Sequence, residues 1–161
     1  MPGRYLSQRD RNIFEKFNKE LIGDLVNAKD GIINQSVIIY KISTYDTETN
    51  LYGEAAGGKV FNSGVKVACI IEADDFDWNT DEFGPDERQN ATFSFIRQAL
   101  VDLSFVVEVG DTIEWNWGYF EINSINENQL LGGQQDNNWG IVCIAHRVRS
   151  SNLNIERVRS I

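Results

Sequence analysis

The stretch from Val109 to Gln129 (VGDTIEWNWGYFEINSINENQ) constrains the fold most, because it has the composition of two paired strands. Aromatic and β-branched residues, which suit the pleated surface of a sheet, occupy both halves. Between the halves, Trp117-Gly118 offers a glycine that can take the positive φ of a tight connection. We therefore predict a β-hairpin in which Thr112–Asn116 pairs with Tyr119–Ile125. In its second arm the apolar residues are Phe120, Ile122 and Ile125, and Glu121 and Asn123 lie between them. This hairpin has the character of scaffold, with no catalytic constellation in it.

Further strands are predicted wherever apolar residues run together or alternate with polar ones. The predicted segments are Ile32–Ser43, Val60–Phe61, Gly64–Ala73, Ala91–Phe95 and Ile141–Arg149, with Leu51–Ala55 as another candidate. The run from Gly64 to Ala73 is almost continuously apolar, which favours a central and well-buried strand.

Two segments have helical periodicity. After Asp10, a suitable N-cap, apolar residues recur at helical spacing and predict an amphipathic helix over about 11–27. Its apolar residues are Ile13, Phe14, Phe17, Leu21, Leu25 and Val26. This face would either cover a sheet of its own chain or dock onto a neighbouring subunit. A short second helix is predicted over Ile96–Leu103.

Many strands at short spacing and few helices predict a mainly β (α+β) fold. We expect a small, partly closed antiparallel β-barrel or sandwich with an N-terminal amphipathic helix and one short helix. The 161 residues, with four Trp, five Tyr and nine Phe, suffice for a single domain with a real core. The core would span about residues 10–149, and residues 150–161 would form a C-terminal tail that docks on a neighbouring subunit.

The net charge of −9 is distributed unevenly. The segment from Glu72 to Glu87 contains eight carboxylates and no lysine or arginine, whereas the segment from Arg147 to Ile161 contains four arginines and one glutamate. An acidic body speaks against tight DNA binding, which needs a basic surface. We expect no membrane contact, because no apolar run reaches a membrane-spanning length. The N-terminal residues lack the apolar core of a secretory signal, so we expect a soluble protein made in a cytoplasm.

No catalytic residue, cofactor site or metal site is predicted. The acidic segment Asp74–Glu87 is interpreted as a solvated loop at a subunit edge. The alternative, a divalent-cation site, does not fit EF-hand spacing. Gly132-Gly133 lacks the rest of a nucleotide-binding loop. His146 is the only histidine, and in a strand it would face away from Cys143, which prevents a nucleophile–base pair. Cys143 and Cys69 are expected to be buried thiols.

Several residues are candidates for contacts with partners, because they combine charge or aromatic surface with expected exposure. They are Asp74, Asp75, Asp77 and Trp78 of the acidic segment, Trp139 of the polar loop Gln129–Gly140, and Arg147, Arg149, Arg157 and Arg159 of the basic C-terminal part.

A series of short motifs resembles the neck proteins of tailed bacteriophages, of the head-closure (stopper or head-completion) type. In order, the motifs are LIGDLVN, VIIYKIS, NLYGEA, GVKVACII, FGPDERQNATFSFIRQAL, VGDTIEWNWGYFEI, NENQLLGG and CIAHRVR, and they cover most of the chain. The resemblance implies a structural virion protein that joins the portal side to the tail and helps retain or pass packaged DNA. Its partners would be its own copies in a six- or twelve-fold ring, portal or adaptor proteins, and tail proteins. DNA would be only transient cargo, and the protein would be made in the host bacterial cytoplasm and reside in the virion.

Three other interpretations remain open. The chain could be a tail-terminator or another neck ring of the same virion. It could instead be an SH3-like or OB-like binding module for a host protein or glycan, with Trp117 and Trp139 as recognition aromatics. The third is an enzyme whose metal is held by the Asp74–Glu87 carboxylates.

Overall fold

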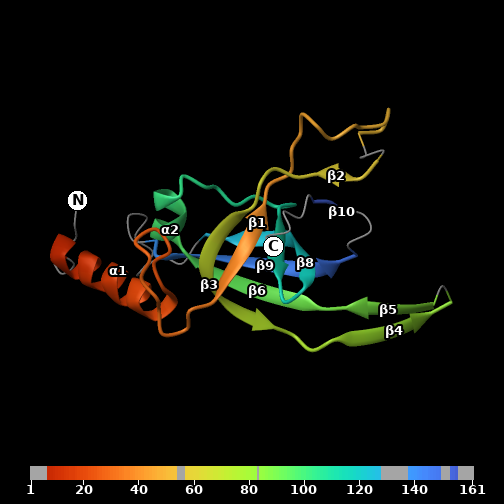
Figure 1. The fold of residues 1–161 in the computed structure, drawn as a ribbon. Helices are drawn as coiled ribbons and strands as arrows, with labels where there is room; N and C mark the ends of the chain where they lie inside the picture. Colours follow the sequence, from red (N-terminus) through yellow and green to blue (C-terminus); the bar gives the residue numbers. More distant parts are fainter. Residues whose placement is uncertain (1–6, 54–56, 83, 128–137, 150–152, 156–161) are drawn as a thin grey trace, which may run out of the picture.

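Six antiparallel strands close into a barrel in the computed structural model, which describes residues 7–53, 57–82, 84–127, 138–149 and 153–155 (Figure 1). Around the barrel the order is β1-β3-β6-β9-β8-β7, and β1 pairs with β7 to complete the circle. These strands are β1 Ser36–Tyr40, β3 Val65–Ala73, β6 Asn90–Ile96, β7 Thr112–Trp115, β8 Gly118–Asn126 and β9 Gly140–Val148. The mainly β fold with an N-terminal helix is therefore confirmed, and the barrel is closed where the sequence predicts partial closure.

The barrel interior is filled by the side chains that alternate inward along each strand. On β6, Ala91, Phe93 and Phe95 are buried while the residues between them are half-buried, as predicted from their alternation. Phe93 has no exposed surface and lies edge-on to Trp115 and Phe120, with ring centroids 6.4 and 5.8 Å away. Such edge-to-face contacts add to the large burial of aromatic surface.

The predicted central hairpin is present, but its turn differs from the prediction. β7 and β8 pair from Thr112 opposite Glu121 to Trp115 opposite Gly118, so the turn consists of Asn116 and Trp117. Both have positive φ, 47° and 62°, as a two-residue turn of the primed type requires. Gly118 instead begins β8, where a Cβ would lie 3.2 Å from Nε of Arg147. The absence of a side chain at Gly118 therefore lets the Arg147 side chain pack closely against β8.

The second strand of this hairpin, β8, contains a β-bulge. The pairing with β9 shifts between Ile122 and Ser124, which leaves Asn123 as the extra residue. Apolar residues at 122 and 125 are three positions apart, and a regular strand cannot place both on one face. The side chain of Asn123 lies beside that of His146, with Oδ1 2.6 Å from Nδ1.

The acidic segment is wrongly predicted as a loop. It forms a second hairpin from β4 Asp77–Asp81 and β5 Gly84–Arg88, which extends away from the barrel (Figure 1). The barrel pairing of β3 with β6 ends at Ala73 opposite Ala91 and resumes at Asp77 opposite Arg88. Three residues on one strand thus oppose two on the other, and this irregularity separates the projecting hairpin from the barrel. We call β4 and β5, with the connecting residues 74–76, the arm.

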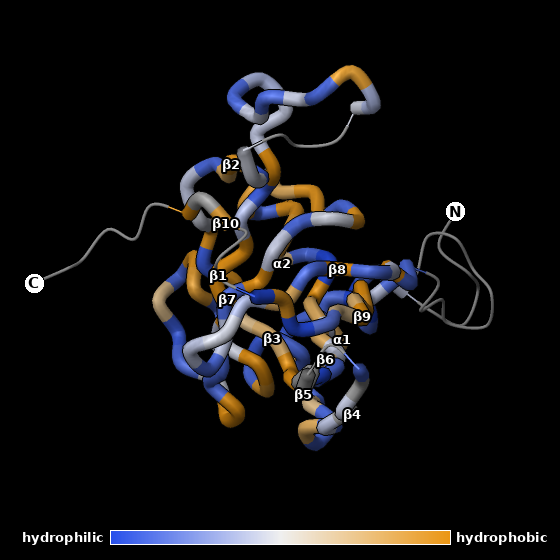
Figure 2. Tube along the Cα trace, turned by 90° about the vertical axis from the view of Figure 1, so that its right-hand side faces the viewer, coloured by the Kyte–Doolittle hydropathy of each residue, from blue (hydrophilic) through white to orange (hydrophobic). Residues whose placement is uncertain are grey.

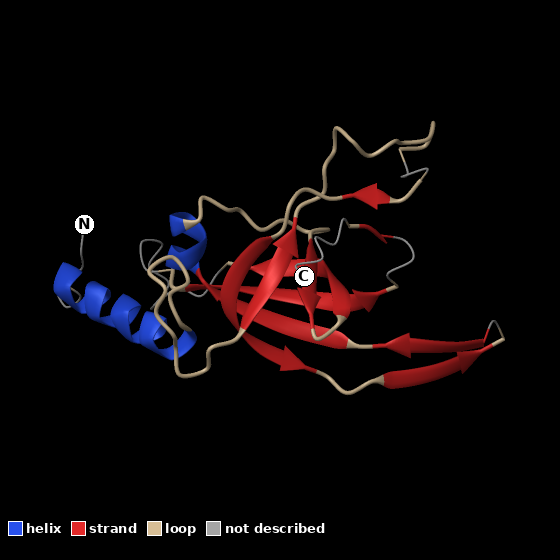
Figure 3. Cartoon of the chain, in the orientation of Figure 1, coloured by secondary structure: helices blue, strands red, loops and turns tan. Residues whose placement is uncertain are grey.

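Both helices lie at the other end of the barrel from the arm (Figure 3). α1 spans Gln8–Ile22, so it begins and ends earlier than predicted, and its N-cap is Ser7 rather than Asp10: the Ser7 side chain accepts a hydrogen bond from the Asp10 backbone N–H. α2 spans Arg97–Asp102, as predicted within one residue at each end. The end of α1 contacts the barrel through a small cluster of Ile22, Ala68 and Ile96.

The remaining strands are short. β2 is Lys59–Val60 and pairs in parallel with β10, Leu153–Asn154, so part of the C-terminal tail adds a strand within its own chain. The predicted strand Ile32–Ser43 is regular only over β1, and residues 51–53 of the candidate strand Leu51–Ala55 form a turn. The loop between β1 and β2 projects from the barrel (Figures 1 and 2).

Candidate interaction surface

The helix α1 directs its apolar residues toward solvent. Ile22 is its one buried residue, whereas Ile13, Phe17 and Leu21 are 38%, 60% and 39% exposed. These three residues are spaced by four, so they form one row along the helix. We call this row the outer stripe. The sequence leaves open whether the apolar face covers its own sheet or another subunit. In the structure Ile22 packs against the barrel, whereas Phe17 of the outer stripe is 60% exposed.

The side of α1 that faces its own chain is largely polar. Glu15, Asn18 and Lys19 are half-buried there. Glu15 and Asn18 line a groove whose opposite wall includes Arg97 and Gln98 of α2. An amphipathic helix ordinarily buries its apolar stripe against the core, whereas α1 buries Ile22 and leaves its outer stripe between 38% and 60% exposed.

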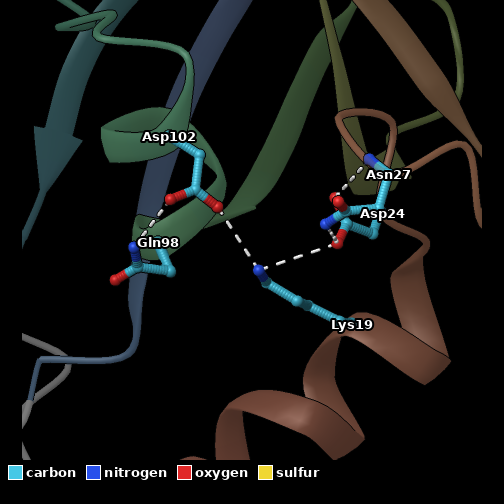
Figure 4. A network of polar contacts seen from close by, with 5 residues as sticks. All are labelled: Lys19, Asp24, Asn27, Gln98 and Asp102. Carbon is cyan, nitrogen blue, oxygen red and sulfur yellow. Dashed lines mark hydrogen bonds and ion pairs between the residues drawn. The ribbon is translucent and has the colours of Figure 1, made fainter.

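A polar network fixes this orientation (Figure 4). The Lys19 ammonium lies 3.3 Å from Oδ2 of Asp102 on α2 and 3.7 Å from Oδ2 of Asp24, just beyond α1. Asp102 also accepts a hydrogen bond from Gln98, at 2.8 Å. Lys19 therefore bridges the two helices and the turn after α1.

Asp24 is the most constrained member of this network. The Asn27 side-chain amide donates to its Oδ2 at 2.6 Å, and the Asn27 backbone N–H donates to Oδ1. The Asn27 side-chain hydrogen bond is the main reason that the pKa of Asp24 is lowered, with smaller contributions from backbone N–H groups and Lys19 against the opposing effect of burial. The charged form of Asp24 is thus the one that the fold stabilises.

Trp139 lies near the N-terminal half of α1. Its ring is 5.7 Å from that of Phe14, centroid to centroid, and the Trp139 carbonyl accepts a hydrogen bond from the Arg97 backbone N–H. Trp139 is half-buried by these intrachain contacts. Of the polar loop Gln129–Gly140 in which the sequence places it, residues 129–137 lie outside the described part.

The arm carries four of the predicted contact residues. Asp74, Asp75 and Asp77 are exposed, and Trp78 is 65% exposed. Phe76, at the base of the arm, is 46% exposed. The arm therefore presents aromatic surface and negative charge together, with Asp74, Asp75 and Asp77 exposed to solvent on and beside the hairpin.

Arg147 joins the arm to the barrel. Its guanidinium lies over the Phe76 ring, 5.2 Å from the centroid, and its backbone N–H donates to the Gln89 carbonyl. A cation over an aromatic face is attracted by the ring quadrupole. Arg149 is exposed just after β9. Arg157 and Arg159 lie outside the described residues.

Two further places expose large side chains. In the loop between β1 and β2, Tyr45, Leu51 and Tyr52 are almost completely exposed, and at the tip of the central hairpin Trp117 is 90% exposed. Scattered single apolar residues are normal on a surface, whereas grouped ones mark interaction sites.

The groups considered for chemistry are placed as predicted. Cys69 and Cys143 are buried free thiols, and burial raises the pKa of each to about 12. Such thiols are inert rather than nucleophilic. Cys143 points into the barrel, and His146 lies on the opposite face beside Asn123.

Within the described residues, no three His, Cys, Asp or Glu side chains form a group that could hold a metal ion. No helix in the same part of the chain is long and apolar enough to span a membrane.

Comparison with known proteins gives a likeness of structure and none of sequence. No protein-family model matches the sequence, and no curated protein matches it. A solved structure described as "Virion of native gene transfer agent (GTA) particle" contains a chain that aligns with a TM-score of 0.49 at 14% identity. The alignment covers 71% of this chain and 94% of that chain.

Proposed function

We propose that this chain is a structural protein of a tailed-phage virion, a ring-forming head-to-tail connector of the head-closure type. Its ring joins the portal side to the tail and helps to retain or pass the packaged DNA. Its partners are other copies of itself, portal or adaptor proteins and tail proteins, and DNA passes only as transient cargo. The role is one of assembly, without catalysis or a cofactor.

The sequence resemblance supports this proposal because its motifs coincide with the elements of the barrel. VIIYKIS falls on β1, GVKVACII on β3, VGDTIEWNWGYFEI on β7 and β8, and CIAHRVR on β9. FGPDERQNATFSFIRQAL runs from the arm through β6 into α2. The similarity therefore extends over the strands that define the fold, in their order along the chain.

The observation that carries the proposal is the orientation of α1. A helix that turns polar residues to α2 and leaves Ile13, Phe17 and Leu21 exposed is suited to an assembly, because docking removes that apolar area from water. Phe76 and Trp78 of the arm also expose aromatic surface that docking would remove from water. A subunit of a ring has such surfaces on its sides.

Deletion of the gene from the phage that encodes it, followed by electron microscopy of the particles, tests the proposal. We expect tailless heads that lose their DNA. Full, stable heads beside free or over-long tails would instead assign the protein to a tail-terminator or another ring on the tail side. Normal infectious particles would refute a neck role.

A second candidate function is a binding module of the SH3-like or OB-like kind, which recognises a host protein or glycan. Trp117 favours it, because an almost fully exposed tryptophan at a hairpin tip is a ready contact for a ligand. Trp139 fits less well, since it is half-buried against Phe14. This function predicts a stable monomer, whereas a connector subunit self-associates.

A further inference from the structure

We propose that Arg147 is a clamp that fixes the arm in one direction against the end of the barrel, and that the base of the arm is a hinge. Arg147 is a positioning residue in this proposal, because it sets the direction in which the arm presents Phe76 and Trp78. The inference concerns the single chain and does not rest on the proposed ring.

The base of the arm lacks the regular pairing that would make it rigid. The ladder of the barrel ends at Ala73, and the ladder of the arm begins at Asp77. Between them, the Asp74 backbone N–H donates to the Asn90 carbonyl at 2.9 Å, and the Gln89 side-chain amide donates to the Asp74 carbonyl at 3.1 Å. Unequal numbers of residues on two paired strands interrupt the ladder and bend it. Because hinges are short stretches at the ends of elements, we place the hinge at residues 74–76 and 89–90.

Arg147 contacts both sides of this hinge from β9, a strand of the barrel. Its guanidinium lies over the ring of Phe76, which directly precedes β4, at 5.2 Å from the centroid. Its backbone N–H donates at 2.8 Å to the carbonyl of Gln89, which directly follows β5. Phe76 is 46% exposed, so burial in the barrel does not hold its ring. One residue of the barrel thus holds the chain where it enters the arm and where it leaves.

Gly118 gives the guanidinium its place on the barrel. A Cβ at Gly118 would lie 3.2 Å from Nε and 3.6 Å from Cζ of Arg147, so the guanidinium packs against the backbone of β8, where glycine has no side chain. The Arg147 side chain is therefore held on β8 while its cation attracts the face of the Phe76 ring.

The clamp links two exposed tryptophans. Trp117 directly precedes Gly118 at the tip of the central hairpin and is 90% exposed, and Trp78 on the arm is 65% exposed. Arg147 contacts the residue next to Trp117 and the residue two positions before Trp78. It therefore sets the position of one tryptophan relative to the other. Without the clamp, Trp78 moves with the arm and Trp117 stays with the barrel.

The experiment measures the direction of the arm in the purified full chain with two spin labels. Thr80 on β4 and Val109 in the turn before β7 are exposed, and Thr80→Cys and Val109→Cys supply the labelling sites. Cys69 and Cys143 stay unlabelled because they are buried. Double electron–electron resonance then gives the distribution of distances between the labels. Amide ¹⁵N relaxation gives the order parameters of the arm and of the barrel in the unlabelled chain.

Three substitutions test the clamp. Arg147→Leu removes the cation, Phe76→Leu removes the ring, and Phe76→Tyr keeps the ring. Arg149→Leu is the matched control, because Arg149 is an exposed arginine two residues further along the chain. Circular dichroism confirms that each variant is folded. Since Phe76 is half exposed, its variants preserve the test even where Arg147→Leu fails to fold.

We expect one narrow distance distribution in the wild type, in Phe76→Tyr and in the control, with arm order parameters of about 0.85. Arg147→Leu and Phe76→Leu should each broaden the distribution and lower the order parameters of the arm toward about 0.6, while those of the barrel stay unchanged. The double variant should broaden the distribution no further than either single variant, because both substitutions remove the same contact.

A broad distribution in the wild type would overturn the clamp, and so would an unchanged distribution in Arg147→Leu or in Phe76→Leu. Equal broadening in the control, or loss of order in the barrel together with the arm, would show a general effect on folding and would also refute it. The neck role is judged separately by gene deletion, so the failure of either proposal leaves the other standing.

Discussion

The same substitution at two phenylalanines should have very different effects on the stability of the monomer. Phe93 on β6 has no exposed surface, and Phe17 on α1 is 60% exposed. We therefore expect Phe93→Ala to destabilise the monomer strongly and Phe17→Ala to leave it almost unchanged. The comparison isolates burial, because the chemical change is identical at both positions.

The burial of each side chain sets the expected loss of unfolding free energy. Phe93→Ala empties a closed site between Trp115 and Phe120, and truncation of a buried phenylalanine costs about 3–5 kcal/mol of unfolding free energy. Complete burial of a phenylalanine contributes about 1.5–3 kcal/mol, and Phe17 loses only two-fifths of its surface to burial, so its truncation should cost no more than about 1 kcal/mol.

Urea denaturation at a low protein concentration measures both values without a contribution from self-association. In a thermal scan the Phe93→Ala change should lower the midpoint by about 6–20 °C, since each kcal/mol shifts a chain of this size by about 2–4 °C. A loss at Phe17 as large as that at Phe93 would refute the orientation of α1, because it would mean that the outer stripe is buried within its own chain.

Three further predictions concern the interior. Gly31→Ala should lower the melting temperature and loosen the turn after α1, because a Cβ at Gly31 would lie 2.3 Å from the backbone nitrogen of Gly23, and only backbone movement can relieve that overlap; proteolysis of the turn would detect it. Burial raises the pKa of Asp111, so the native chain keeps the Asp111 carboxyl protonated to higher pH than the unfolded chain does. The free energy of unfolding therefore falls as pH rises from about 4 through the folded pKa of Asp111. Asp111→Asn should gain stability relative to the wild type over that interval, and urea unfolding at a series of pH values would contradict this by showing a constant difference. Cys69 and Cys143, whose pKa values are about 12, should react with a thiol reagent only at the rate of unfolding, and rapid labelling of the native chain would contradict their burial.

The sequence predicts the barrel strands well because burial on one face imposes a period of two. Ala91, Phe93 and Phe95 are predicted and found on the inside of β6. The same rule, applied to β8, also predicts its bulge. Ile122 and Ile125 are three residues apart, and only an extra residue between them allows both to serve the core. Strict alternation, applied to the spacing, would have placed the irregularity near Asn123.

The arm is missed for a physical reason. Its strands project beyond the barrel and have no core to line, so burial imposes no alternation on their sequence. Clustered carboxylates further suggest a solvated loop. β4 and β5 pair because β3 and β6, the antiparallel barrel strands that precede and follow them, bring the chain side by side at the barrel edge. A local pattern cannot report that geometry.

Helical periodicity in the first residues identifies an amphipathic helix but says nothing of which surface covers it. The apolar row of Ile13, Phe17 and Leu21 would look the same in a helix that packs on its own sheet. The decisive evidence is on the opposite side, where Lys19 reaches Asp102 and Asp24 and so holds the polar side inward. Because those ion pairs are themselves partly exposed and individually weak, they are a modest anchor for a helix whose apolar row remains in water. Weak ion pairs on one side and an apolar row in water on the other favour a chain that completes the burial of α1 only in an assembly. For this reason the stability of α1 should depend on the concentration of the protein.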